Sequence, residues 1–196
     1  MPKNRLEAFS DGVLAIIITI MVLELKVPPG HTPAALLTLL PTLSSYLLSF
    51  IYVGIYWNNH HHMFQTTETV SGGVLWANLH LLFWLSLFPF VTSWLAESRL
   101  APFPTAAYGT VLLMAGLAYF LLQYTIIREQ GSGSLLAEAI GSDFKGKISP
   151  AFYIAGIAVA GFYPWISASL YVAAALMWLV PDRRIEKRIT HAGKSE

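Results

Sequence analysis

Cysteine is missing altogether from the 196 residues. Its absence excludes disulfide bonds, thiol catalysis and metal sites built on thiolates. Charged residues are also scarce, at 12% of the chain against roughly 25% in an average globular protein. A soluble fold of this size needs more charge to cover its surface, and 55% of the residues are hydrophobic, so the sequence predicts an integral membrane protein. The net charge of +1 gives no reason to expect nucleic acid as a partner.

Long apolar segments organise the chain. A helix that crosses a bilayer of about 30 Å needs roughly 20 largely apolar residues. The second such segment contains Pro41, which either begins the span or kinks it. The last two are short and separated only by Tyr163-Pro164, which suits a tight hairpin. The sequence therefore predicts a single all-α, polytopic membrane domain over residues 1–196, with six transmembrane helices at residues 6–27, 34–57, 72–96, 105–127, 149–162 and 165–180.

Basic residues predict the orientation of these spans. Six spans place both termini on one side, and cytoplasmic segments carry an excess of Lys and Arg. With the N-terminus inside, only Lys26 and Arg99 lie outside, and an inner loop at 128–148 and a cytoplasmic tail at 181–196 hold most of the others. The ten inner basic residues are Lys3, Arg5, Arg128, Lys145, Lys147, Arg183, Arg184, Lys187, Arg188 and Lys194.

Ser10 and Asp11 stand at the head of the first apolar segment. Either residue would suit a helix N-cap at the membrane surface. The uninterrupted apolar run of residues 12–23 is about 18 Å long as a helix, too short to cross the hydrocarbon. A helix over 6–27 would cross it, and Asp11 would then lie inside the helix, where an ionisable group usually faces a bundle interior or water. With charges at both ends, this span is the least compatible with lipid and belongs at the centre of the protein.

One face of the same helix is apolar. Ile16, Ile20, Leu23 and Val27 recur at steps of four, three and four residues, and Thr19 lies on the flank of that face. Spacing alone favours plain packing as the explanation.

Histidines invite a metal interpretation that the spacing does not support. His60, His61 and His62 are successive residues, about 100° apart around a helix, whereas helical ligands need i, i+4 spacing. We expect interfacial histidines here, one or two of them bonded to other spans. His80 is expected to hydrogen-bond across helices, as polar membrane residues commonly do. The sequence predicts no cofactor, no metal site and no enzyme.

Three stretches resemble one protein family. The motif R-x-x-x-F-S-D, formed by Arg5, Phe9, Ser10 and Asp11, resembles the signature of the lysosomal potassium channel family, transmembrane protein 175. The run FSDGVLAIIITIMVLEL is similar to its prokaryotic branch. YWNNHHHMF (56–64) and NLHLLFWLSLFPFVTSW (78–94) extend the resemblance over at least the first three spans.

The resemblance implies a potassium-selective cation channel in the plasma membrane of a prokaryote. Single-repeat members of the family assemble as homotetramers whose first helices line the pore. An isoleucine five residues after the motif aspartate forms a hydrophobic constriction, which corresponds to Ile16, with Ile20 and Leu23 further along the same face. Thr19 matches a threonine of the pore helix. With the resemblance, a pore-lining role replaces packing as the interpretation of this face.

The polar residues of the motif are then expected to be structural. Arg5 lies about 240° around the helix from Asp11, so a direct pair needs a bent or extended side chain. Partners for Ser10 and Asp11 are left open by the sequence. The candidates are Trp57, Asn58, His60, Asn78 and His80.

No T-V-G-Y-G segment is present, so a carbonyl-lined potassium filter is not available. We expect a hydrophobic constriction that gates by dewetting, with only modest potassium selectivity. Pore size, a partly hydrated ion and the Thr19 hydroxyl are candidate sources of that selectivity. The alternative is a proton-coupled secondary transporter or proton pathway that uses Asp11 and a membrane histidine.

Overall fold

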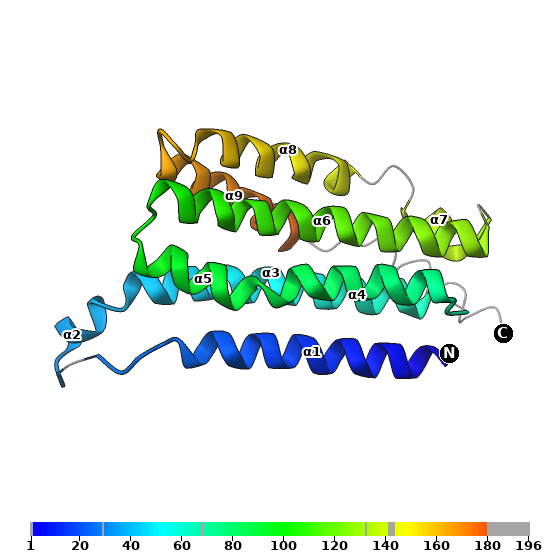
Figure 1. Ribbon diagram of the computed structural model, residues 1–196, viewed down its shortest axis with the longest axis horizontal. Helices are drawn as coiled ribbons and strands as arrows, with labels where there is room; N and C mark the ends of the chain where they lie inside the picture. Colours follow the sequence, from blue (N-terminus) through cyan, green and yellow to red (C-terminus); the bar gives the residue numbers. More distant parts are fainter. Residues whose placement is uncertain (1, 29, 68, 132, 141–143, 180–196) are drawn as a thin grey trace.

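The computed structural model describes residues 2–28, 30–67, 69–131, 133–140 and 144–179. Every regular element in these ranges is a helix, which confirms the predicted all-α class for the described residues. Most of the helices run along one common axis (Figure 1). They are α1 (Lys3–Leu23), α2 (Pro33–Leu37), α3 (Leu40–Gln65), α4 (Gly72–Ser86), α5 (Phe88–Glu97), α6 (Pro102–Gln130), α7 (Leu135–Ile140), α8 (Phe144–Val159) and α9 (Pro164–Leu179).

The helices form layers across the bundle. In Figure 1, α1 lies along one edge, α3, α4 and α5 lie next to it, and α6 separates them from α8. Helix α1 contacts only the neighbouring layer strongly, through α3, α4 and α5, whereas α6 also packs against α8 and α9. Fully buried side chains such as Leu81, Leu85 and Leu112 fill the middle of the bundle. The first helix is thus an edge helix within one chain.

Prolines set two helix boundaries. Pro41 lies in the first turn of α3, so it begins this helix, and residues 33–37 form the separate helix α2. The predicted span at 72–96 is interrupted, because α4 ends at Ser86 and α5 begins at Phe88 with Pro89 in its first turn. A proline lacks the N–H that would bond to the carbonyl four residues earlier. The expected single helix is therefore two consecutive ones.

The inner loop predicted at 128–148 is wrong for much of its length. Helix α6 continues to Gln130, α7 occupies Leu135–Ile140, and α8 already begins at Phe144. Gly131, with a φ of 90°, ends α6 in a conformation that glycine adopts at no steric cost. The predicted tail at 181–196 lies outside the described residues.

Three helical stretches among the described residues are long and apolar enough to cross a membrane. They are α1, the consecutive α4–α5 segment at Gly72–Glu97, and α6. Helix α9 is apolar but shorter, and α3 and α8 do not meet the same criteria of length and composition. The number of six spans therefore stays a prediction.

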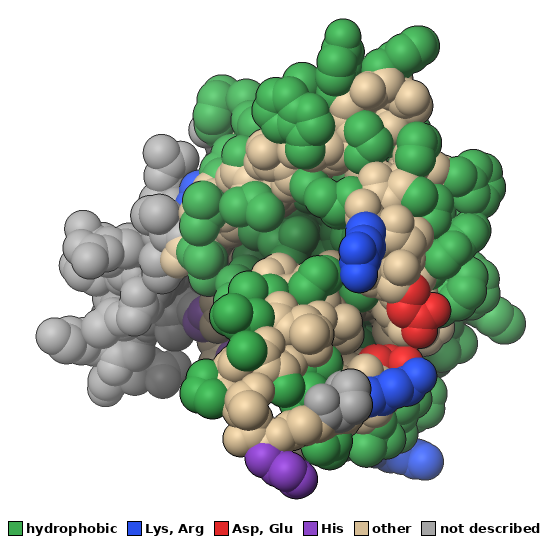
Figure 2. All heavy atoms as spheres, turned by 90° about the vertical axis from the view of Figure 1, so that its left-hand side faces the viewer, with side chains coloured by type: hydrophobic (Ala, Val, Ile, Leu, Met, Phe, Trp, Pro, Cys, Tyr) green, Lys and Arg blue, Asp and Glu red, His purple; other side chains and the backbone are tan. Residues whose placement is uncertain are grey.

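Large apolar side chains also cover the outside of the bundle. Figure 2 views the end that carries α2, where hydrophobic side chains dominate and charged ones are few. Phe162 at the α8–α9 turn and Trp165 at the start of α9 are 81% and 64% exposed. Aromatic side chains at the ends of helices are typical of membrane–water interfaces.

The α8–α9 hairpin is held against α6 by one tyrosine. The ring of Tyr171 lies so close to Gly109 of α6 and Gly156 of α8 that a Cβ at either glycine would overlap it. Its hydroxyl donates to the carbonyl of Thr105 (3.3 Å), and its own carbonyl accepts from the Tyr52 hydroxyl (2.6 Å). Two glycines thus make the space in which three helices meet.

Candidate pore helix and its anchoring site

Ser10 and Asp11 lie well inside the first helix. Helix α1 begins at Lys3, and Pro2 caps it without a side-chain hydrogen bond. The N-cap alternative for Ser10 or Asp11 is therefore wrong. Both residues are more than one helical turn from the N-terminus, as the length of the apolar run required.

The sides of α1 differ in burial. Leu6, Ser10, Leu14, Ile17 and Met21 are buried, at steps of four, four, three and four residues. At about 100° per residue, the predicted stripe is centred roughly a third of a turn from that buried side. Its members Ile16, Ile20 and Leu23 are 58%, 44% and 77% exposed. The packing of one chain therefore does not account for the predicted stripe.

A buried polar network attaches α1 to α3 and α4. The Asn78 amide nitrogen donates to the Ser10 hydroxyl oxygen at 3.0 Å, and the Ser10 hydroxyl donates to the Leu6 carbonyl at 2.9 Å. The Asn78 carbonyl oxygen lies 2.8 Å from Nε2 of His60, so this nitrogen carries the proton. All three side chains are at least 97% buried. A satisfied network of this kind specifies one arrangement of its helices, because misalignment would leave buried polar groups without partners.

Asp11 has a different partner, on the surface. Nε1 of Trp57 donates to its Oδ1 at 3.1 Å, and the Trp57 ring stacks on His61 with 16° between the ring planes. Both members of the bond are exposed within one chain. The two successive motif residues Ser10 and Asp11 thus fix α1 to α4 and α3 respectively.

Four of the remaining sequence candidates lie outside this network. Asn58, Arg5 and Phe9 are exposed. His80 accepts a hydrogen bond from Nε1 of Trp84 in its own helix (3.0 Å), so the expected bond to another helix is wrong. Its i, i+4 spacing to Trp84 makes the nearer partner available without any tertiary contact.

The histidine run behaves as expected in part. His60 bonds to α4, whereas His61 lies 2.9 Å from the Gln65 amide nitrogen of its own helix. Within the described ranges, no group of three His, Cys, Asp or Glu side chains could hold a metal ion.

A second attachment of α1 was not foreseen from the sequence. Ser93 of α5 donates to Oε2 of Glu24, the C-cap residue of α1, at 3.2 Å. The sequence signal for this attachment was the carboxylate of Glu24 directly after an apolar run, because a charged group near a membrane usually pairs with another group. Helix α1 is therefore held at two levels, by Ser10 and Asp11 in its N-terminal half and by Glu24 directly after its last residue.

Thr19 lies on the exposed part of α1 and donates its hydroxyl to the Ile16 carbonyl at 2.9 Å. Because the hydroxyl proton is used within the helix, its oxygen lone pairs remain as acceptors toward the outside. A neutral oxygen with spare lone pairs is a ligand suited to an alkali cation.

The comparisons with known proteins agree with one another. The family model for the endosomal/lysosomal potassium channel TMEM175 matches residues 5–89. A potassium channel from Chryseobacterium is 59% identical over 189 residues, which cover 96% of this chain and 98% of that protein. The crystal structure of a lysosomal potassium-selective channel TMEM175 homolog from Chamaesiphon minutus matches with a TM-score of 0.79 at 27% identity, over 91% of this chain and 96% of that one. The proton channel TMEM175 of Gallus gallus is 29% identical over 122 residues, 59% of this chain and 24% of that protein.

Proposed function

Because the chain belongs to the TMEM175 family, we propose that it is a potassium-permeable cation channel with modest selectivity for potassium. The Chryseobacterium relative, which this chain matches over nearly its whole length, is named a potassium channel. Members of this family are ion channels and not enzymes.

The pore of the proposed channel is formed by α1 from four copies of the chain. One observation carries this proposal: α1 is fixed by a buried polar network on one side while Ile16, Ile20 and Leu23 stay exposed on another. A helix turns by about 100° per residue, which places Arg5 and Phe9 of the motif on the same side of α1 as the stripe and away from its buried side chains. A charged residue on that side favours other copies and water over lipid as its surroundings.

Rings of Ile16, Ile20 and Leu23 around a four-fold axis would form the constriction. Such apolar rings gate by dewetting when they are narrow. Thr19 lies next to this stripe and contributes a hydroxyl oxygen that can accept a cation in place of a hydration water. Four such oxygens select weakly, which agrees with the modest selectivity expected without a carbonyl filter.

The proposed setting is the plasma membrane of a prokaryote, with both termini cytoplasmic. Six crossings would be made by α1, α3, the α4–α5 pair, α6, α8 and α9. The start of α1, the end of α6 and the start of α8 point toward the same end of the bundle (Figure 1), and these segments carry the described inner basic residues. Lys26 and Arg99 follow helix ends at the other end. This distribution supports the orientation through the positive-inside rule.

A proton-coupled transporter is the second candidate. It requires Asp11 and a histidine to form a titrating pair. The hydrogen-bond partner of Asp11 is instead Trp57, and His60 is bonded to Asn78. The Gallus gallus relative is named a proton channel.

The test is current across a bilayer that contains the purified protein, under opposed potassium and sodium gradients. Wild type is compared with Ile16→Asn, and with Leu117→Asn as the control at a similarly exposed residue of α6. A potassium-weighted reversal potential that Ile16→Asn alone moves toward zero, or a current that it alone enlarges, supports both channel and constriction. A current unchanged by Ile16→Asn moves the gate elsewhere. No current, with uptake that needs a proton gradient, favours the transporter.

A further inference from the structure

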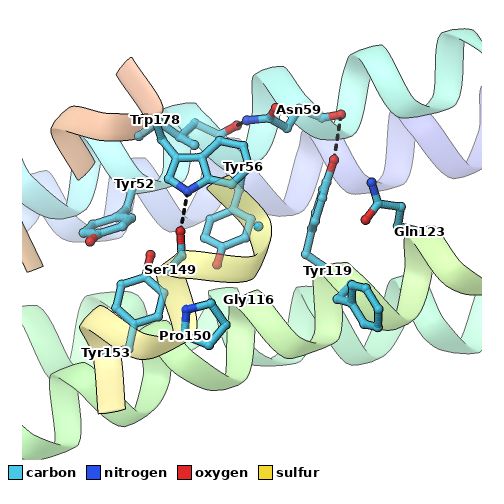
Figure 3. A pocket seen from close by; sticks show the side chains of 13 residues that line it. Tyr52, Tyr56, Asn59, Gly116, Tyr119, Gln123, Ser149, Pro150, Tyr153 and Trp178 are labelled. Atoms are coloured by element: carbon cyan, nitrogen blue, oxygen red, sulfur yellow. Dashed lines mark hydrogen bonds between the residues drawn. The ribbon is translucent and has the colours of Figure 1, made fainter. Parts of the chain in front are cut away.

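A cavity lies among helices other than the proposed pore helix. It is lined by residues of α3, α6, α8 and α9, and no residue of α1 takes part (Figure 3). The cavity volume is about 60 Å³. Since each water needs roughly 10–15 Å³ of such volume, the cavity has room for about four waters, which in liquid fill about 120 Å³. This is the size range of a single six-membered ring.

Aromatic side chains form nearly half of its wall. The tyrosines at 52, 56, 119 and 153 and the indole of Trp178 line the cavity, and no described residue with a charged side chain does so. The Trp178 Nε1 donates to the Ser149 hydroxyl at 2.8 Å and the Tyr119 hydroxyl donates to the Asn59 carbonyl at 3.3 Å, as the dashed lines in Figure 3 mark. These bonds hold two of the rings in place. Flat, fixed aromatic faces suit an uncharged ring.

Two polar groups in this wall have no hydrogen-bond partner among the described residues. The Tyr56 hydroxyl and the Gln123 amide form no hydrogen bond with any residue that the structure describes. Both side chains are at least 91% buried, and they reach the cavity from α3 and α6. The Tyr56 hydroxyl oxygen lies 3.8 Å from the position of a Cβ on Gly116, which also lines the cavity. Buried polar groups of this kind are costly unless something in the cavity bonds to them.

We propose that this cavity binds one uncharged six-membered ring that carries a single hydroxyl or carbonyl group, as in a phenol. The ring packs between the tyrosines, and its polar group bonds to the Tyr56 hydroxyl, which lies beside Gly116. A charged ligand is excluded because no counter-charge lines the wall. The bound molecule bridges α3 and α6 to the α8–α9 hairpin, and the site is independent of the proposed pore.

The test uses 4-fluorophenol as the probe and the full chain in detergent micelles. Saturable broadening of the ¹⁹F signal is expected for wild type. Gly116→Val fills the cavity without a clash at its Cβ, since the nearest atoms are 3.8 Å away, and should weaken binding at least tenfold. Gly54→Val is the matched control, because a Cβ on Gly54 of α3 meets nothing within 4 Å. It should bind as wild type does.

A second variant separates the polar contact from simple filling. Tyr56→Phe should weaken 4-fluorophenol about tenfold and leave fluorobenzene, which has no hydroxyl, unchanged. Broadening that never saturates indicates partition into detergent, or a cavity that holds water only, and overturns the proposal. Saturable binding that is equal in wild type and Gly116→Val overturns it as well, because the probe then binds elsewhere.

Discussion

The side-chain nitrogen of Asn78 donates to the hydroxyl of Ser10, and this one bond sets the rotation of α1 about its own axis. A shift of α1 by one residue would turn it by about 100°. Ser10 would then leave Asn78, and the side that exposes Ile16 would change. The Asn78–Ser10 bond, on the buried side of α1, therefore helps to set the position of the proposed constriction on the exposed side.

Asn78→Leu should destabilise the chain. It removes both bonds of the amide and leaves the buried Ser10 and His60 without their partner, at a cost of about 1–3 kcal/mol for each group. Thermal unfolding of the purified protein measures the loss. Asn58→Leu is the control, since Asn58 is exposed. Equal melting temperatures for the two variants would contradict the structural role of the network.

Asp11→Asn should be tolerated better than Asp11→Leu. Asn keeps an oxygen that can accept from Nε1 of Trp57, whereas Leu leaves the indole without its bond. Because the bond is exposed, we expect a loss of only about 0.5–1.5 kcal/mol for Asp11→Leu. Size-exclusion profiles and potassium flux of both variants measure the effect. A folded Asp11→Asn oligomer that has lost all flux would instead show that the titration of Asp11 is needed for transport.

Gly109→Ala should weaken the packing of the α8–α9 hairpin. The added Cβ overlaps the hydroxyl and ring of Tyr171, and overpacking of this kind costs about 1–3 kcal/mol. Gly54→Ala, which meets no neighbour within 4 Å, should be neutral or slightly stabilising because alanine is the better helix former. Adding Tyr171→Phe to Gly109→Ala removes the overlapping oxygen and should recover part of the loss. Independent effects of the two substitutions, measured by thermal unfolding, would refute the clash.

Ser93→Ala should loosen the C-terminal end of α1. It removes the donor to Glu24, so the last turn of the helix opens more often. Hydrogen exchange of amides 18–25 measures this opening and should become faster. Ser98→Ala is the control, because the Ser98 hydroxyl bonds only to the Leu95 carbonyl of α5. Unchanged exchange in Ser93→Ala would show that packing alone holds this end.

Much of α1 could be predicted from the sequence, because its length and its motif are properties of one continuous segment. The length of the apolar run placed Asp11 inside a helix, and the motif singled out Ser10 and Asp11 as anchors. The choice among five candidate partners required the tertiary structure, since Trp57, His60 and Asn78 come from helices whose rotation no local pattern determines. His80 was misassigned because a partner one turn away in its own helix competes with any partner across the bundle.

The remaining differences arise where hydropathy is a poor guide to backbone geometry. The break before Pro89 is invisible to an average over an apolar span, although the missing N–H is plain in the sequence. The segment at 128–148 has a loop-like composition, yet α7 and the start of α8 lie within it. The aromatic cavity combines residues from four helices, with up to 126 positions between Tyr52 and Trp178 (178 − 52), so no local signal could reveal it.

The interruption at Leu87 has a mechanical consequence. Its two sides, α4 and α5, each hold α1 at a separate point, through Asn78 to Ser10 and through Ser93 to Glu24. A continuous helix such as α1 behaves as a rod of nearly fixed length. The angle between α4 and α5 therefore cannot change unless α1 tilts with it or releases one of its two attachments. In a ring of four chains, a change in the angle between α4 and α5 would tilt each α1 and so change the width of the pore.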